Sequence, residues 1–241
     1  MATAKVCAMT TTQTPPVPFA VTPRRPGEPE ADLMGFTLIH RALRSGTRML
    51  ADATSAIAAG QPCSRERQRA IVQVTRSVLH EITKHHQRED DVLWPVIVAS
   101  AGTAIDLEPL SDDHTVLHKV LDRAAEALPQ FARDPAGGAP LLAPVLTELA
   151  DLLDEHIGEE EAEVFPVIRR FVSAGDFGRC ERMFQQGTAP GQMLFLLPWI
   201  ADQCTPAERD EVLRMAGAPL RLLLWLGEGR YTRRRDAVLG R

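Results

Sequence analysis

Cysteine is scarce in this chain, and its distribution excludes two common kinds of site. The four cysteines lie far apart and form no C-x-x-C pair. A disulfide framework or a zinc–thiolate site requires closer or patterned spacing. We therefore expect reduced thiols in a cytoplasmic protein.

Long apolar runs and an excess of positive charge are missing as well. The most apolar runs, 193–200 and 220–226, are too short to span a bilayer, which takes about 20 residues, and proline or charge interrupts them. Residues 1–14 lack the apolar stretch of a signal peptide. The formal net charge is −5, whereas nucleic-acid-binding proteins present a basic face. The sequence thus predicts no membrane span and no nucleic-acid partner.

Most of the chain carries helical patterning, and it divides into three parts. Residues 1–29 hold many prolines and threonines and few large apolar residues, so we expect a disordered tail. Residues 30–173 contain four long amphipathic segments with short connections, at about 30–59, 64–99, 109–134 and 140–173. This pattern predicts an all-α, up-down-up-down four-helix bundle.

Residues 174–241 are expected to form a short helical C-terminal extension. Its helical stretches lie near 176–186, 190–203, 206–216 and 218–226, and glycine and proline separate them. Residues 190–226 are rich in leucine and tryptophan, and such a surface requires cover. We expect it to pack on the bundle. The alternatives are a homodimer contact or a contact with a partner protein.

The second and fourth predicted helices share a sequence pattern. One reads HHQREDDVLWPVI from His85, and the other reads HIGEEEAEVFPVI from His156. When their prolines are aligned, the histidine, the glutamate four residues later (Glu89 and Glu160), an acidic neighbour, an aromatic residue and Val-Ile all coincide.

The first and third predicted helices also correspond, with HRAL from His40 matching HTVL from His114. The repeat thus predicts that residues 30–173 form two copies of a helical hairpin, each with a lone histidine and a His-x-x-x-Glu pair. Residues four apart lie about 40° from one another around a helix, so the imidazole and the carboxylate point the same way. The faces that carry the histidines also carry apolar residues, among them Val78, Leu121 and Leu153.

Carboxylates that point into an apolar interior predict a bound cation, because a buried charge without a partner is costly. One metal ion cannot use six protein ligands and still react, whereas two ions bridged by the carboxylates can. Neutral imidazole with carboxylate suits iron better than a zinc–thiolate or an all-oxygen calcium site. The candidate metal ligands are His40, His85, Glu89, His114, His156 and Glu160.

These features resemble the haemerythrin-like, or HHE cation-binding, family over roughly residues 30–173. The resemblance rests on His40, on the two His-x-x-x-Glu blocks that end in an aromatic residue and proline, and on Asp113-His114. It implies a non-haem di-iron centre of two iron ions with an oxo or hydroxo bridge. It also implies that the centre binds O₂, H₂O₂ or NO, or responds to iron and redox state, in oxygen carriage, sensing or stress defence.

The six candidate ligands differ at two positions from the ligands of haemerythrins proper. Those proteins use a second histidine on the third helix, where His118 follows His114 by four residues. They also place the fourth-helix carboxylate five residues after its histidine, where Glu161 stands. Because the internal repeat matches His118 with Arg44 and favours Glu160, we treat His118 and Glu161 as the less favoured ligands.

Several residues near the candidate ligands are not expected to bind metal. His86 is one step off the ligand face and is expected to be exposed, as is His80. Pro95 and Pro166 predict interruptions of the second and fourth helices. Further polar residues share the site face and are expected at the surface, the alternative being that they orient imidazoles or line a pocket for an exogenous ligand: Arg44, Thr47, Glu81 and Glu163.

Three functions are compatible with the sequence. We favour a di-iron protein that reversibly binds or reduces a small oxidant in a cytoplasmic stress or sensing role. A second hypothesis is an enzyme that decomposes peroxide at the same metal pair. The third is a helical interaction module without metal chemistry, with residues 190–226 as its contact surface.

Overall fold

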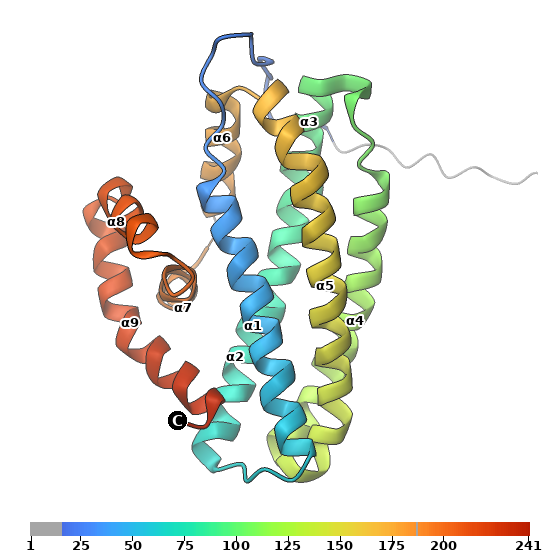
Figure 1. Ribbon diagram of the computed structural model, residues 1–241, viewed down its shortest axis with the longest axis vertical. Coiled ribbons are helices and arrows are strands. Elements are labelled where there is room, and N and C mark those ends of the chain that lie inside the picture. Colours follow the sequence, from blue (N-terminus) through green and yellow to red (C-terminus); the bar gives the residue numbers. More distant parts are fainter. Residues whose placement is uncertain (1–15, 187) are drawn as a thin grey trace, which may run out of the picture.

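A computed structural model of the chain describes residues 16–186 and 188–241, which form helices and contain no strand. Four long helices lie side by side along the longest axis (Figure 1): α1 (Met34–Ala58), α2 (Arg65–Arg88), α4 (Glu108–Arg133) and α5 (Pro135–Phe171). Consecutive long helices run in opposite directions. The predicted all-α, up-down-up-down four-helix bundle is confirmed.

The second helical segment of the bundle is interrupted beside Pro95. Helix α2 passes through a π-helical turn, η1 (Glu89–Leu93), into α3 (Trp94–Ala101), and a short 3₁₀ turn, η2 (Gly102–Ala104), follows. Pro95 has no backbone N–H to donate to the preceding turn, and the wider π turn accommodates it. The interruption thus lies where Pro95 predicts one, and it begins at Glu89, a predicted metal ligand.

Helix α5 begins earlier and runs more regularly than the sequence suggests. It starts at Pro135, directly after Asp134, and continues through Pro166. A Cβ atom at Gly138 would collide with the backbone of Phe131, so this glycine permits the close hairpin between α4 and α5. The interruption expected at Pro166 is wrong, because buried neighbours on both sides of the proline hold the helix against the bundle.

The interior of the bundle consists of two apolar cores with a polar layer between them. One core includes Leu43, Ile82 and Leu153, and the other includes Phe36 and Leu93. Buried histidines and glutamates lie between these two cores, and each of the four long helical segments contributes at least one of them. Apolar side chains therefore cover the polar layer on both sides along the bundle axis.

Among the described residues, α5 is the one helix that is long and apolar enough to cross a membrane. Its apolar window is 44% buried inside the bundle. The core helix of a bundle passes the same test, and α5 also carries the buried His156 and Glu160. The length and composition of α5 are therefore those of a helix that contributes one face to the core of a bundle.

The C-terminal extension packs on one side of the bundle (Figure 1). It consists of α6 (Ala174–Gln185), α7 (Pro190–Ala201), α8 (Pro206–Met215) and α9 (Ala218–Leu239). Phe195 and Trp199 of α7 and Tyr231 of α9 belong to the same buried core as the bundle residues. Gly46 of α1 makes room for Trp199, since a Cβ there would lie 2.6 Å from the indole ring. The extension thus packs on the bundle, the first of its three expected arrangements.

Helix α9 extends well beyond the end expected near residue 226. Its Gly227 lies where a Cβ would collide with the backbone of Leu194 in α7, so this glycine permits close packing and does not end the helix. The outer side of α9 leaves apolar side chains exposed: Leu222, Trp225 and Leu226.

Residues 16–33 precede α1 and contact α6. The backbone N–H of Thr22 donates to the carboxylate of Asp176 at 2.7 Å, and the guanidinium of Arg179 lies 3.9 Å from the centre of the Phe19 ring. The described part of the predicted tail therefore touches the folded chain, because its few apolar residues find cover there. The preceding part of that tail lies outside the described residues.

Replacing Trp199 by alanine is expected to destabilise the attachment of the extension. The Trp199 side chain is 1% exposed, and truncation of a buried tryptophan costs about 3–5 kcal/mol. The matched control is Trp225→Ala, whose side chain is 72% exposed and whose loss should change stability by about 0.5 kcal/mol or less. Urea unfolding of both variants measures the difference, and equal effects would contradict the packing of α7 on α1.

Candidate metal centre

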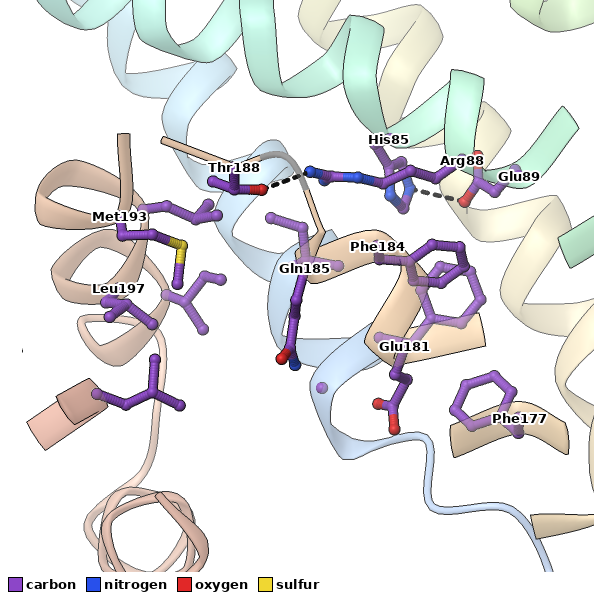
Figure 2. Close-up of a pocket in the computed structure, with 16 residues that line it drawn as sticks. His85, Arg88, Glu89, Phe177, Glu181, Phe184, Gln185, Thr188, Met193 and Leu197 are labelled. Atoms are coloured by element: carbon purple, nitrogen blue, oxygen red, sulfur yellow. Dashed lines mark hydrogen bonds and ion pairs between the residues drawn. The ribbon is translucent and has the colours of Figure 1, made fainter. Parts of the chain in front are cut away.

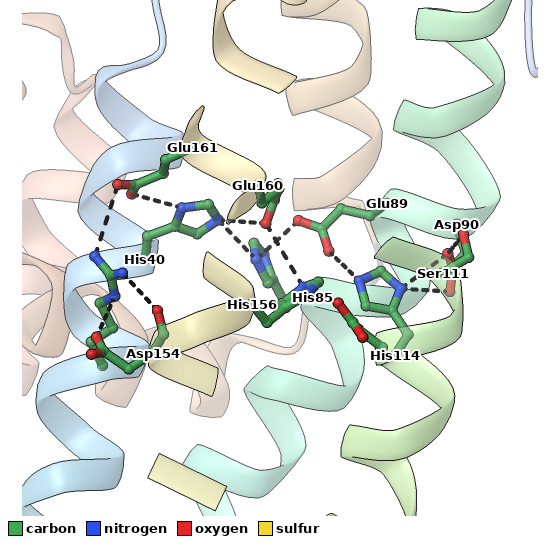
Figure 3. A network of polar contacts seen from close by, with 12 residues as sticks. His40, His85, Glu89, Asp90, Ser111, His114, Asp154, His156, Glu160 and Glu161 are labelled. Carbon is green, nitrogen blue, oxygen red and sulfur yellow. Dashed lines mark hydrogen bonds and ion pairs between the residues drawn. The ribbon is translucent and has the colours of Figure 1, made fainter. Parts of the chain in front are cut away.

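The structure brings the six predicted ligands into one layer across the middle of the bundle. Each side chain comes from a different turn of a long helix or of η1, and their exposed fractions range from 0% to 6%. Figure 3 shows the imidazoles and the two glutamates converging from all sides of the bundle. The residues of this layer are His40 on α1, His85 on α2, Glu89 on η1, His114 on α4, and His156 and Glu160 on α5.

One cluster of donors combines residues of α1, α2, η1 and α5. The Nε2 atoms of His40 and His85 are 3.1 Å apart, and Nε2 of His85 is 2.9 Å from Oε1 of Glu89. Oε2 of Glu160 lies 3.4 Å from Nε2 of His40. One ligand atom from each of these four residues lies within 4.8 Å of the others, which is close enough for all four to hold one ion.

A second cluster lies beside the first and consists of His86, His114 and His156, again with ligand atoms within 4.8 Å of one another. Both glutamates of the first cluster also approach the second cluster. Glu89 directs Oε1 toward His85 in the first cluster and Oε2 toward His114 in the second, at 3.5 Å. Oε2 of Glu160 is 4.0 Å from Nε2 of His156 as well as close to the first cluster. Each carboxylate can therefore contact ions on both sides.

His86 was expected to be exposed, and this expectation is wrong. Its side chain is 0% exposed, and its ring stacks on His114 with centroids 4.2 Å apart. Because α2 contacts several helices, its buried face is wider than the arc centred on His85. The signal for His86 is its spacing from Leu79 and Ile82, which places it in an apolar a/d-type series.

His118 and Glu161, the less favoured ligands, lie at the edge of the layer. His118 is half-buried, with its ring centroid 5.9 Å from that of His86, and it joins neither cluster. Oε1 of Glu161 lies 2.9 Å from Nδ1 of His40, on the outer side of that ring. The geometry thus favours Glu160 over Glu161 as the inward carboxylate of α5.

Carboxylates outside the layer contact the outer nitrogens of three imidazoles. Besides Glu161 at His40, both oxygens of Asp90 lie 3.0 Å from Nδ1 of His114. Oδ2 of Asp113 lies 3.6 Å from Nδ1 of His156. An Nδ1–H donated outward leaves the Nε2 lone pair facing the layer, which is the form that binds a metal. Asp90 and Glu161 are the acidic neighbours that follow Glu89 and Glu160 in the internal repeat. The repeated acidic position thus contacts the outer nitrogen of a histidine in each half of the repeat.

Two polar residues expected at the surface are buried instead. Thr47 is 1% exposed, and its hydroxyl donates to the carbonyl oxygen of Leu43 at 2.9 Å, which satisfies it within α1. Glu81 is 4% exposed, and burial raises the pKa of its carboxyl group. Arg44 lies nearer the surface, where its Nε is 2.8 Å from Asp154.

Charge in the layer is unbalanced without a cation. Burial opposes protonation of His40, but the carboxylates of Glu160 and Glu161 outweigh it and raise the pKa of His40 to about 9. Burial, followed by the charge of Glu160, raises the pKa of Glu89 well above its ordinary value. Burial, followed by the neighbouring imidazoles, lowers the pKa of His85 well below its ordinary value. The carboxyl group of Glu89 and the imidazole of His85 thus favour their neutral forms, whereas the imidazole of His40 favours its protonated form beside two carboxylates.

Hydrogen bonding does not satisfy this layer either. Neither oxygen of Glu89 or Glu160 and neither ring nitrogen of His86 makes a hydrogen bond of acceptable geometry. Buried polar atoms in folded proteins nearly always have partners. Unpartnered nitrogen and oxygen donors in two adjacent clusters fit two cations, and the mix of imidazole and carboxylate is one that iron accepts.

Comparison with known proteins identifies the family. Residues 35–168 match the family model of the hemerythrin HHE cation binding domain, and this range contains every residue of the layer. Neither the curated proteins nor the solved structures contain a significant match. The family match covers more than half of the chain, and the clustered histidines and glutamates agree with it. The chain therefore belongs to the hemerythrin HHE cation-binding domain family, and it is a metal-binding protein of the four-helix-bundle type.

Proposed function

We propose that this chain holds two iron ions in its polar layer and that the pair binds a small oxidant, O₂, H₂O₂ or NO, in a cytoplasmic sensing or stress-response role. The observation that supports this most directly is the position of the two glutamates. Each lies between two clusters of imidazoles, an arrangement that suits a pair of adjacent ions better than one. The oxo or hydroxo bridge expected from the family is part of the same proposal.

The ligands divide unequally between the two positions. His40 and His85 would hold one ion, and His86, His114 and His156 would hold the other. Glu89 and Glu160 would contact both ions. The first position would have fewer imidazoles, which would leave more room there for an exogenous ligand.

When bound, an iron pair supplies reversible electron transfer and coordination positions for a small oxidant. The chain itself orients the ligands and excludes water. Glu161 and Asp90 fix two imidazoles from outside, and the Phe36 ring lies 4.6 Å from the ring of His40. Trp94, which belongs to the same apolar core as Phe36, stacks beside His114, with ring centroids 6.2 Å apart. These aromatic rings keep the layer dry, which strengthens its electrostatic interactions.

The proposal is tested by loading the metal-free protein with ferrous iron under argon and then admitting air. We expect two iron ions per chain and a change of visible absorption when oxygen enters. Zero or one iron ion per chain, with a flat spectrum, would contradict the proposal. Oxygen evolution from peroxide by the loaded protein would favour the peroxide-decomposing enzyme instead. A metal-free protein that still binds a partner through residues 190–226 would favour the interaction module.

Replacing Asp90 by asparagine is expected to weaken iron binding without removing a ligand. Asp90 accepts from the outer nitrogen of His114, and loss of such a carboxylate typically costs about 10–100-fold in metal affinity. The control is Asp91→Asn, the neighbouring exposed aspartate, which should bind iron like the unmodified chain. Competition with a chelator of known affinity measures both. Loss of a whole iron ion in Asp90→Asn would mean that Asp90 is a ligand rather than a support for His114.

A further inference from the structure

An apolar cavity of about 220 Å³ lies between the bundle and the C-terminal extension. Its inner end is formed by His85 and Glu89 of the first metal-binding cluster. Figure 2 shows these two residues on one side and Met193 and Leu197 of α7 on the other. Most of its remaining wall is apolar and includes Phe36, Phe177, Phe184 and Ile200.

The size of this cavity exceeds what a small oxidant requires. An apolar cavity of about 150 Å³ stays dry and takes up benzene. A cavity of 220 Å³ therefore has room for a somewhat larger organic molecule, such as a fused two-ring aromatic compound. A diatomic molecule or peroxide would leave most of this volume unfilled.

The charged residues around the cavity indicate a ligand without net charge. Arg88 lies along one side, where its Nη2 donates to the hydroxyl of Thr188 at 3.2 Å and its Nη1 lies 4.0 Å from Glu81. Glu181 lies on another side, so the cavity is bordered by one cation and one further anion. The charge of Arg88 is already offset by the nearby carboxylate of Glu81, and the wall of the cavity, as far as the structure describes it, includes no further lysine or arginine for an acidic ligand.

The outer wall of the cavity belongs to the part of the chain that the family match does not cover. Helices α6, α7 and α9 supply this wall, whereas the match ends at residue 168. The cavity is thus a feature that the extension adds to the haemerythrin-like bundle.

We infer that the C-terminal extension creates a binding site for a small, uncharged, mainly apolar organic molecule beside His85 and Glu89. This inference rests on the proposed function in one respect: if iron is bound, a molecule in the cavity would lie against the first iron position. The binding itself depends on the walls of the cavity and does not require iron.

The test uses indole as the neutral probe and indole-3-carboxylate as its charged counterpart, titrated calorimetrically into the full-length protein with and without iron. We expect indole to bind at one site and about tenfold or more tightly than the carboxylate, which corresponds to about 1.4 kcal/mol. No measurable binding of indole to either form, or equal binding of the two probes, would overturn the inference.

Two substitutions locate the site. Leu197→Trp places a larger side chain in the cavity and should weaken indole binding about tenfold or more, and Met193→Trp does the same from the neighbouring turn of α7. Leu222→Trp is the control, because Leu222 is 55% exposed and lies outside the cavity. Circular dichroism shows which variants remain folded. Indole binding unchanged in a folded cavity variant would overturn the inference.

These results are separable from those of the iron experiment. Indole binding to the metal-free protein would support the cavity site even if no iron binds. Two iron ions per chain without indole binding would support the proposed function and overturn the cavity site.

Discussion

Replacing Glu89 by glutamine is expected to abolish the binding of the iron pair while making the metal-free protein more stable. The side chain of Glu89 is 1% exposed, and its oxygens make no hydrogen bond. Glu160 lies in the same layer, and its charge adds to the burial that raises the pKa of Glu89. Glutamine keeps the shape and is neutral without taking up a proton, so it removes the cost of burying an ionisable carboxyl group, which should stabilise the metal-free fold by about 1–3 kcal/mol. The neutral amide is a poor iron ligand, so the same change removes the group that faces both ions.

Thermal unfolding with a chelator and with ferrous iron separates the two effects. Iron should raise the melting temperature of the unmodified chain by mass action and leave that of Glu89→Gln unchanged. Asp91→Asn is the matched control, since it converts an exposed carboxylate two residues away to an amide. It should match the unmodified chain in both conditions. A Glu89→Gln protein that is less stable without metal, or that is stabilised by iron as before, would contradict the proposed role of Glu89.

Replacing His86 by leucine is expected to remove one of the two iron ions and leave the other. His86 is 0% exposed, and neither ring nitrogen has a hydrogen-bond partner, so leucine can fill its place without stranding a polar group. Only His114 and His156 would then remain as imidazoles in the second cluster. The first cluster, with His40 and His85, keeps all its donors. Iron content after reconstitution should fall to about half, with the fold preserved.

The matched variant is His118→Leu, which replaces the histidine that haemerythrins proper would use. His118 is half-buried and joins neither cluster, so its loss should leave the iron content unchanged. Iron analysis and circular dichroism of the two variants decide between the assignments. The reverse result, with iron lost in His118→Leu and retained in His86→Leu, would show that the second ion takes the haemerythrin-type ligand instead.

Helix α9 exposes apolar residues that a homodimer or a partner protein could cover. Leu222, Trp225 and Leu226 are each more than half exposed on this helix. A homodimer contact or a partner contact through residues 190–226 stays a proposal for this surface. The expected domain boundaries at residues 30, 173 and 174 also stay predictions. In the structure, Phe195 and Trp199 of the extension belong to the same apolar core as the bundle.

Helical periodicity and the internal repeat were enough to predict the bundle and its layer. Spacing of four residues places His85 with Glu89 and His156 with Glu160 on one helix face, because side-chain direction along a helix is a local property of the chain. The repeat then related the two hairpins, and the family match covers the same part of the chain.

The contacts between helices decided the rest. His86 is buried because α2 has neighbours on more than one side, and no periodicity within α2 specifies how wide its buried face is. Pro166 leaves α5 continuous because packed neighbours hold the helix, whereas Pro95 is accommodated by a π turn. The support of His40 by Glu161, and the cavity between α6, α7 and the bundle, join residues far apart in sequence. Local sequence determined which side chains can point together, and only the packing of whole helices determined which of them meet and what space is left between them.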